Sequence, residues 1–271
     1  MKFLFWNTHK NESINTTLSE LIIENHVSIV ILAEYFASIE ELISILASNG
    51  IKMKHYYSGC DRIKLLGSLE GVELEPKRDT SNATIQIING KDILCGVHLN
   101  CQLYSEHKEY REILIEQIVY DIQEVEKEIG TENSIVVGDF NINPYDSSCI
   151  DARYFHGIPV YNEAKRKSRE VAGKKYFMFY NPMWNFLGDF KQPYGTYYHN
   201  NGTQNTYWNI FDQVIFRPVL RKRFVDKSFK ILTETQTKYL LDRNGHPDKN
   251  ISDHLPIIFE FQEEIYYGKE S

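Results

Sequence analysis

The sequence contains no long apolar segment. No run approaches the roughly 20 apolar residues that a membrane-spanning helix requires. In the first stretch, MKFLFWNTHK, four apolar residues from Phe3 to Trp6 are followed at once by Asn7. A secretory signal peptide has an apolar region of about 7–15 residues and a small-residue cleavage site, and neither pattern is present here. We therefore expect neither a membrane span nor a secretory signal.

Cysteine is scarce, and its spacing excludes the common zinc sites. The four cysteines, Cys60, Cys95, Cys101 and Cys149, form no CxxC pair. Scattered cysteines in a chain of 271 residues are typical of reduced thiols in the cytosol. The pattern predicts a cytoplasmic protein that does not use its cysteines to bind metal.

An excess of positive charge is also missing. The formal net charge is −7 and the pI is near 5.8. These values argue against a protein that coats nucleic acid through bulk charge, but they allow an enzyme that meets phosphate through a local basic patch or a metal ion. The chain has neither internal repeats nor a linker rich in Pro, Gly or Ser, and 42% of it is hydrophobic. We expect one domain, residues 1–271.

Strand and helix patterns alternate at first, and strands then follow one another directly. The spacing of apolar residues predicts helices over 14–26, 39–50 and 106–129. In the longest helix, Ile113 and Val125 fall near the side that we expect to be buried. Strands are expected over 2–7, 27–35, 51–58, 63–68, 83–89, 92–99, 134–141, 210–216, 229–234 and 255–261. Clustered strands with few helices predict an α/β domain in which sheets pack together and helices lie outside.

Six of these strands carry a carboxylate, a carboxamide or an imidazole at or near one end. In SIVVGDFN, an apolar strand reaches Gly138, and Asp139 and Asn141 follow. The others are Asn7, Glu34, His98, Asp212 and the pair Asp253–His254. One such residue is ordinary in a polar turn. Six in one chain predict that the strand ends share a site.

The residue types fit a site for a hard cation with proton-transfer groups beside it. Mg²⁺ prefers carboxylate and carboxamide oxygens, whereas zinc favours Cys and His ligands. An imidazole nearby serves proton transfer or phosphate contact, and an Asp bonded to it fixes its tautomer. Asp212 lies within the apolar IFDQVIF and needs a buried partner.

Six short motifs resemble, in order, those of the endonuclease/exonuclease/phosphatase superfamily, which includes pancreatic-type deoxyribonucleases and abasic-site endonucleases. GDFN and SDHLP are the specific members of this set. The resemblance spans nearly the whole chain and implies a four-layered α/β sandwich, in which helices flank two packed mixed β-sheets. The motifs are WN (6–7), AE (33–34), VHLN (97–100), GDFN (138–141), FDQV (211–214) and SDHLP (252–256).

The resemblance implies a Mg²⁺ site, with Mn²⁺ as a substitute. Glu34 is the implied principal ligand, and Asn7 and Asp253 lie nearby as direct or water-mediated ligands. His9 stands where some relatives carry an acidic residue, so a second metal ligand is not expected at that position.

The resemblance also implies the catalytic residues. Asp139 would orient or deprotonate the attacking water, and Asn141 would hold a phosphate oxygen. His254, oriented by Asp212, would act on the phosphate or as general base. His98 would contact the phosphate or assist the leaving oxygen. The implied reaction is in-line hydrolysis of a phosphoester.

Nucleic acid is the favoured substrate, and the favoured activity is that of an endonuclease. The stretch 163–184 holds six cations and then a run of aromatics, a composition that fits phosphate and base contacts or, alternatively, a solvated surface segment. TYWNIFDQV lacks the Pro-x-Trp-Cys-Asp-Arg run of inositol-polyphosphate phosphatases and the Arg of abasic-site enzymes. The alternatives are a phosphatase or phosphodiesterase for a small molecule or lipid headgroup, and a binding module of the same fold without turnover.

Overall fold

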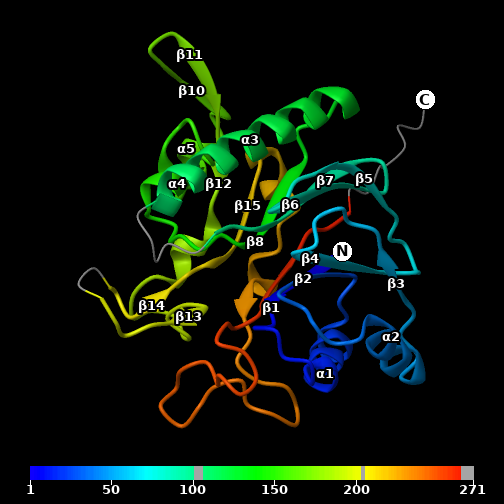
Figure 1. Ribbon diagram of the computed structural model, residues 1–271. Coiled ribbons are helices and arrows are strands. Elements are labelled where there is room, and N and C mark those ends of the chain that lie inside the picture. Colours follow the sequence, from blue (N-terminus) through cyan, green and yellow to red (C-terminus); the bar gives the residue numbers. More distant parts are fainter. Residues whose placement is uncertain (101–105, 203–204, 264–271) are drawn as a thin grey trace.

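Two large β-sheets dominate the computed structural model, which describes residues 1–100, 106–202 and 205–263 (Figure 1). In pairing order, the six-stranded sheet contains β16 (Lys230–Ile231), β17 (Ile257–Glu260), β1 (Lys2–Asn7), β2 (Ile29–Ala33), β4 (Ile63–Ser68) and β3 (Met53–Tyr56). The seven-stranded sheet contains β5 (Leu74–Asp79), β6 (Ala83–Ile88), β7 (Asp92–His98), β8 (Ser134–Asp139), β15 (Asp212–Phe216), β12 (Phe179–Tyr180) and β9 (Gly157–Ile158). Both sheets mix parallel and antiparallel pairs.

Helices cover the outer faces of the two sheets. The helices α1 (Asn15–Asn25) and α2 (Ile39–Ser48) lie against the six-stranded sheet, and α3 (Glu106–Ile129) crosses the seven-stranded sheet (Figure 1). The short helices α4 (Ser147–Ile150) and α5 (Tyr161–Ala164) and the 3₁₀ turns η1 (Pro182–Phe186), η2 (Pro218–Lys222) and η3 (Asp226–Ser228) lie in the connections. The four-layered α/β sandwich expected from the motifs is confirmed.

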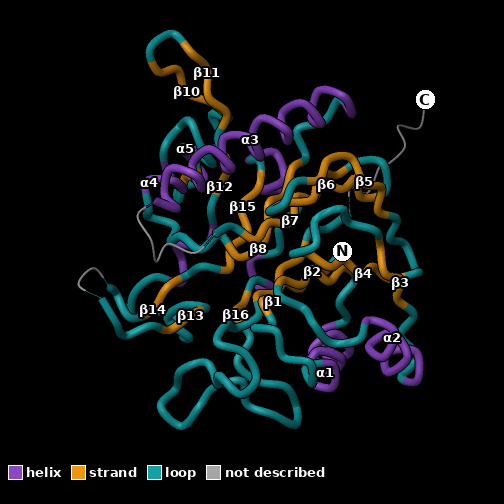
Figure 2. Tube along the Cα trace, viewed as in Figure 1, coloured by secondary structure: helices purple, strands orange, loops and turns teal. Residues whose placement is uncertain are grey.

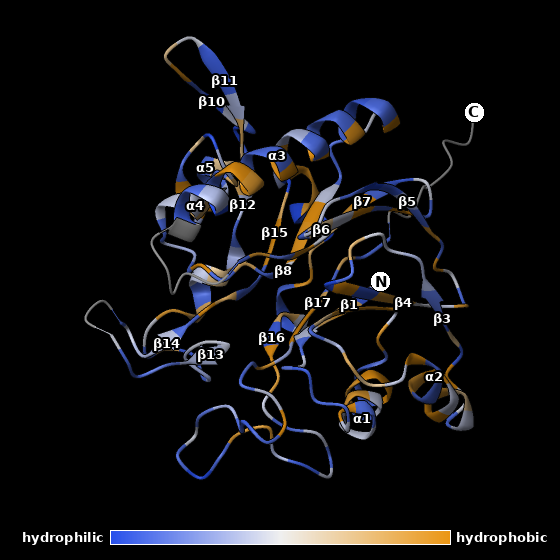
Figure 3. Ribbon diagram, in the orientation of Figure 1, coloured by the Kyte–Doolittle hydropathy of each residue, from blue (hydrophilic) through white to orange (hydrophobic). Residues whose placement is uncertain are grey.

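The alternation of side chains along β8 separates two cores. Ile135 and Val137 belong to the core that both sheets share, whereas Val136 belongs to the core under α3. Successive strand residues point to opposite faces, so a strand buried on both sides reads as a continuous apolar run. This explains why SIVV contains no polar alternation after Ser134 (Figure 3).

Ser38 caps the start of α2. The Ser38 hydroxyl accepts a hydrogen bond from the Glu41 backbone N–H at 3.1 Å. A side-chain acceptor at this position satisfies one of the N–H groups that the first helical turn leaves unpaired. At the other end, Gly50 takes a φ of +78°, which favours glycine.

The burial pattern of α3 differs from the prediction at Ile113. The helix has the expected bounds, but Ile113 is 64% exposed, whereas Ile115 and Ile118 are buried. Together with Ile122 and Val125 they form an i, i+3, i+7, i+10 stripe against the seven-stranded sheet. Ile113 lies on the opposite, exposed face of the helix.

Three strands of the larger sheet, β5, β9 and β12, were not expected, and β5 is the longest of them. The strand β5 reads LEPKRD, with a proline and four charged residues, and it pairs with β6 across a bulge between Pro76 and Arg78. It is an edge strand, where proline and charge are tolerated because one side forms no ladder hydrogen bonds. Composition alone therefore predicts a loop at this position.

No helix in the described part of the chain is long and apolar enough to cross a membrane. Cys60, Cys95 and Cys149 are free and buried, and Cys101 lies outside the described residues.

Candidate active site

Polar strand ends from both sheets meet at one edge of the sandwich. In the seven-stranded sheet, His98 pairs with Asp139, and Asp139 pairs with Asp212, in the registers of β7, β8 and β15. In the six-stranded sheet, Asn7 ends β1 opposite Ala33, and Glu34 follows Ala33 directly. Parallel neighbours end at the same edge, which brings these side chains together.

Gly138 allows β7 and β8 to approach closely next to this edge. A Cβ atom at position 138 would lie 1.8 Å from the Val97 carbonyl oxygen, which no side chain can tolerate. The glycine of GDFN is therefore a packing requirement that places Asp139 beside His98.

Asp139 is held by hydrogen bonds from both sheets. Its Oδ1 accepts from the Asn141 backbone N–H at 2.9 Å, and its Oδ2 accepts from Asn7 Nδ2 at 3.0 Å. The strand does not continue through Asn141, which has a φ of +50° and closes a local turn. A separate hydrogen bond holds the Asn141 side chain at the site, because its Nδ2 donates to the Leu99 carbonyl at 2.9 Å.

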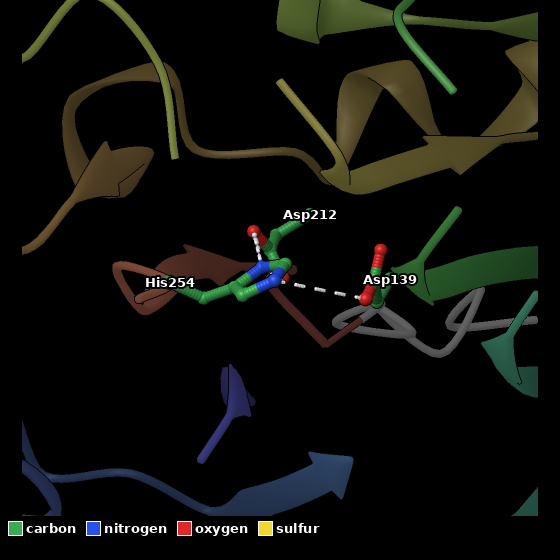
Figure 4. A group of neighbouring side chains, drawn as sticks. All are labelled: Asp139, Asp212 and His254. Atoms are coloured by element: carbon green, nitrogen blue, oxygen red, sulfur yellow. Dashed lines mark hydrogen bonds and ion pairs between the residues drawn. The ribbon is translucent and has the colours of Figure 1, made fainter. Parts of the chain in front are cut away.

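His254 and Asp212 form a buried pair beside Asp139. His254 Nδ1 lies 2.8 Å from Asp212 Oδ2, and His254 Nε2 lies 4.0 Å from Asp139 Oδ2 (Figure 4). The His254 carbonyl accepts from Trp6 Nε1 at 2.9 Å, and the Asp212 backbone N–H donates to Thr196 Oγ1 at 3.1 Å. These contacts fix the ring with Nε2 directed at the cluster.

The two histidines of the cluster differ in charge. Burial acts against protonation of His254, but the carboxylates of Asp212 and Asp139 outweigh it and raise its pKa. Burial raises the pKa of Asp212, and His254 moves it partly back. For His98, burial dominates over the nearby carboxylates and lowers the pKa. At neutral pH the pair therefore carries a proton on His254, whereas His98 is neutral.

Glu34 adopts a strained backbone conformation at the end of β2. Its φ is +49°, in the left-handed region that non-glycine residues rarely adopt. The Glu34 carbonyl accepts from Thr8 Oγ1 at 2.9 Å and from the Lys10 backbone N–H at 3.0 Å. Strain of this kind persists where neighbouring contacts enforce it, as they do here, and it is common at functional sites.

The comparisons with known proteins agree with this geometry at the level of fold. No protein-family model matches the sequence, and no curated protein matches it. Solved structures do match. An AP endonuclease from Archaeoglobus fulgidus has a TM-score of 0.57 at 13% identity, and the match covers 97% of this chain and 100% of that chain. The 3'-5' exonuclease NExo from Neisseria meningitidis has a TM-score of 0.56 at 17% identity over 97% of this chain and 100% of that chain.

A third similar structure is D. rerio TDP2 complexed with a single-strand DNA product, with a TM-score of 0.53 at 15% identity over 97% of this chain and 99% of that chain. The chain has the endonuclease/exonuclease/phosphatase fold. At these identities the likeness shows the fold alone. The roles of individual residues rest on the geometry of this chain.

Two neighbouring groups of residues at this edge could hold a cation, one around Asp212 and the other around Asp253. Asp139, Asp212 and His254 each offer a ligand atom within 4.8 Å of one another. Both Asp212 oxygens, however, already face His254 Nδ1, at 3.1 and 2.8 Å. Asp253 Oδ1 is buried and accepts no hydrogen bond among the described residues, although His9 Nδ1 lies 3.0 Å away. A buried carboxylate oxygen that accepts no hydrogen bond favours a cation on the Asp253 side.

The residues expected as metal ligands surround the same space. Glu34 Oε1 lies 3.6 Å from His98 Nε2, and Asp253 Oδ1 lies 3.9 Å from His254 Nε2. Asn7 reaches the cluster through its hydrogen bond to Asp139. The carboxylate oxygens of Glu34 and Asp253 are ligands that Mg²⁺ prefers and fit such an ion, whereas Asn7 turns its Nδ2 towards Asp139 and its Oδ1 accepts from the His9 backbone N–H at 3.0 Å.

Sequence reasoning missed Arg62. Ile63 pairs with Ala33, so Arg62 lies opposite Glu34 at the same sheet edge. Arg62 Nη1 donates to Asn100 Oδ1 at 3.1 Å, and its charge acts on His98. A cation directly before a strand is a weak signal, because the pairing of that strand decides whether the cation reaches the site.

The basic stretch singled out in the sequence lies at the opposite edge. Its middle part forms the hairpin of β10 (Ser168–Val171) and β11 (Lys174–Phe177), which projects away from the sandwich and is largely hydrophilic (Figures 1 and 3), whereas its aromatic end continues into β12 and η1. Lys167 pairs with Glu132, just before β8 begins, whereas Asp139 ends β8. The six residues of β8 make five steps of about 3.3 Å, so its two ends are about 17 Å apart. The hairpin therefore does not line the site.

A second hairpin lies beside the site instead. It pairs β13 (Tyr197–Tyr198) with β14 (Trp208–Asn209), and Tyr197 forms a bridge with His254. The Tyr197 ring centroid is 4.8 Å from that of His254. This hairpin, rather than β10–β11, forms a wall of the cluster, among the loops that gather at this edge (Figure 2).

Proposed function

We propose that the protein is a Mg²⁺-dependent phosphodiesterase that hydrolyses phosphodiester bonds of nucleic acid as an endonuclease. The supporting observation is the meeting of Asp139, neutral His98 and the charged Asp212–His254 pair, from two sheets, at one edge. Carboxylate, neutral imidazole and imidazolium in one cluster supply the groups that phosphoester hydrolysis needs.

Each residue has a distinct proposed task. Asp139 orients the attacking water and accepts its proton. His254 donates a hydrogen bond through Nε2 to a phosphate oxygen, while Asp212 holds its Nδ1 proton. Asn141 contacts a second phosphate oxygen. His98 lies 3.7 Å from Asp139 and contacts the phosphate or assists the leaving oxygen.

Glu34, Asn7 and Asp253 would hold the metal ion, Mg²⁺ or Mn²⁺. When bound, the ion neutralises charge that develops on the phosphoester oxygens. Both Asp212 oxygens already face His254 Nδ1, which supports assigning the ion to this group instead.

Two further proposals concern the whole chain. Both sheets contribute to one site, which supports one domain over residues 1–271. The cytoplasmic location expected from the cysteine spacing stays a prediction.

The test is cleavage of supercoiled plasmid, linear single-stranded DNA and RNA with Mg²⁺ or Mn²⁺. We expect cutting of at least one of these, including internal cutting of the plasmid, and its loss with EDTA or in His254→Ala. A folded protein that cleaves none of them, but does hydrolyse small-molecule or lipid-headgroup phosphoesters, would overturn the assignment to nucleic acid. Metal binding without hydrolysis of any phosphoester would overturn the enzyme assignment.

A further inference from the structure

Three neighbouring strand ends carry side chains that surround Glu34 but take no part in the proposed chemistry. Lys10 follows β1, Phe36 follows β2, and Arg62 precedes β4. The strands β1, β2 and β4 are adjacent in the six-stranded sheet and spaced about 4.8 Å apart, so the three residues share one edge. All three are exposed.

Phe36 is a large apolar side chain in an unusual place. Its side chain is 62% exposed, two residues after Glu34, and Lys10 Nζ lies 6.0 Å from its ring centroid. Single exposed hydrophobics are common on protein surfaces. An open aromatic ring under a lysine, at the edge of a phosphoester site, is a combination that suits a nucleobase and its phosphate.

The backbone holds this arrangement in place. The Lys10 N–H donates to the Glu34 carbonyl at 3.0 Å, which ties the end of β1 to the turn that carries Phe36. In the same turn, the Tyr35 hydroxyl donates to Asn15 Oδ1 at 2.6 Å. Tyr35 is buried and Phe36 is not, so the turn directs one aromatic ring inward and the next outward.

Arg62 places a second cation on the other side of Glu34. It donates one N–H to Asn100, and a guanidinium has five N–H donors, enough to hold a phosphate as well. Phe36 follows β2, which lies between β1 and β4, so the two cations come from the strands on either side of it. This arrangement fits a nucleotide whose base stacks on Phe36 while the flanking phosphates are neutralised.

We propose that Lys10, Phe36 and Arg62 form a substrate rim that binds an unpaired nucleotide next to the scissile bond. The protein then acts on single-stranded rather than duplex nucleic acid, because a base in a duplex has both faces covered by its neighbours. This inference rests on the proposed function and names its substrate class.

The test is binding, measured by fluorescence anisotropy with EDTA present so that turnover does not contribute. The probes are a short single strand, its duplex, and the same strand with every base removed. We expect the wild type to prefer the normal single strand. Phe36→Ala should weaken that binding by about 5-fold to 150-fold without affecting the baseless strand. Phe36→Trp should preserve it.

The cations have a different expected signature. Lys10→Ala and Arg62→Ala should weaken binding of the normal and baseless strands alike, and should reduce its salt dependence. The matched control is Tyr176→Ala. Tyr176 also lies under a lysine, with Lys174 Nζ 5.2 Å from its ring centroid, but on β11 at the opposite edge. The variant Tyr176→Ala should bind all three probes as the wild type does.

The proposed substrate rim would be contradicted if Phe36→Ala lost equal affinity for the normal and the baseless strand. It would also be contradicted if the wild type bound the duplex as tightly as the single strand. Failure of the proposed function is separate. If the binding pattern holds while no phosphodiester is cleaved, the rim stands and the nuclease assignment falls. If cleavage occurs without the binding pattern, the nuclease assignment stands and the rim falls.

Discussion

His254 and Asp212 are joined at 2.8 Å although they belong to different sheets. Asp212 begins β15 of the seven-stranded sheet, and His254 precedes β17 of the six-stranded sheet. Both side chains are buried. The pair therefore links the two halves of the sandwich at the site, and each residue supplies the partner that a buried charge needs.

Asp212→Asn tests the electrostatic half of this pair. The substitution keeps the size of the side chain but removes the charge that raises the pKa of His254. We expect turnover to fall by about 10²–10⁴-fold and the pKa of His254 to fall. Steady-state kinetics and an NMR titration of the imidazole measure the two effects. Asp226→Asn, an exposed member of the Arg221 ion pair, is the control. Wild-type turnover in Asp212→Asn would contradict the assignment.

Glu34→Gln tests the metal site. The substitution preserves shape but removes the charge of the proposed principal ligand. Mg²⁺ or Mn²⁺ affinity should fall by at least about tenfold, as measured by titration calorimetry. Glu40→Gln is the matched control, because Glu40 is an exposed carboxylate at the start of the neighbouring α2. Equal affinities in the wild type and Glu34→Gln would place the principal ligand elsewhere.

Arg217→Leu tests a buried ion pair at the opposite edge of the sheet. Arg217 Nε and Nη2 donate to the two Glu126 oxygens at 2.7 and 3.1 Å; Arg217 is buried, and the Glu126 side chain is 10% exposed. Removing one partner leaves an unpaired buried charge, so the free energy of unfolding should fall by about 3–5 kcal/mol in urea denaturation.

Two variants check the reason for that loss. The exposed Arg153 forms a similar two-point pair with Asp151, and Arg153→Leu should cost far less stability than Arg217→Leu, because water screens the exposed pair. Adding Glu126→Met to Arg217→Leu should restore much of the stability, because neither charge is then left alone. A double variant no more stable than Arg217→Leu would argue against the unpaired charge as the cause.

The stability of the fold should depend on His156 below neutral pH. Burial lowers the pKa of His156 from 6.5 to about 4, and its Nε2 is buried without a partner among the described residues. Between these two values the unfolded chain binds more protons than the folded one. Stability is therefore lost as pH falls from about 6.5 to about 4, by at most about 3 kcal/mol from this residue.

Urea unfolding of the wild type and His156→Leu across this pH range measures the effect. His156→Leu should lose less stability on acidification than the wild type, because the two proteins share all carboxylates and all other histidines. Parallel curves for the two proteins would show that His156 does not titrate as expected.

Local patterns were sufficient for most of the elements. The apolar run before Gly138, the capping pair Ser38 and Glu41, and the bounds of α3 follow from periodicity and capping chemistry, which act within a few residues. The edge strand β5 was missed because its proline and charges suit a strand only when one side has no neighbour. Ile113 was wrongly expected to be buried, because the sheet beneath α3 decides which face of the helix is covered.

The sequence by itself determined which residue types end the strands, and hence that they suit a hard cation with proton-transfer groups beside it. Tertiary structure decided which of them meet. Strand order and register place Asp212 beside His254 and Arg62 opposite Glu34. The basic hairpin lies near Glu132, at the start of β8, whereas the site lies at the end of that strand. The physical reason is that the functional group of a side chain is fixed by the residue type. Which side chains meet depends instead on strand pairings between residues that are distant in the chain.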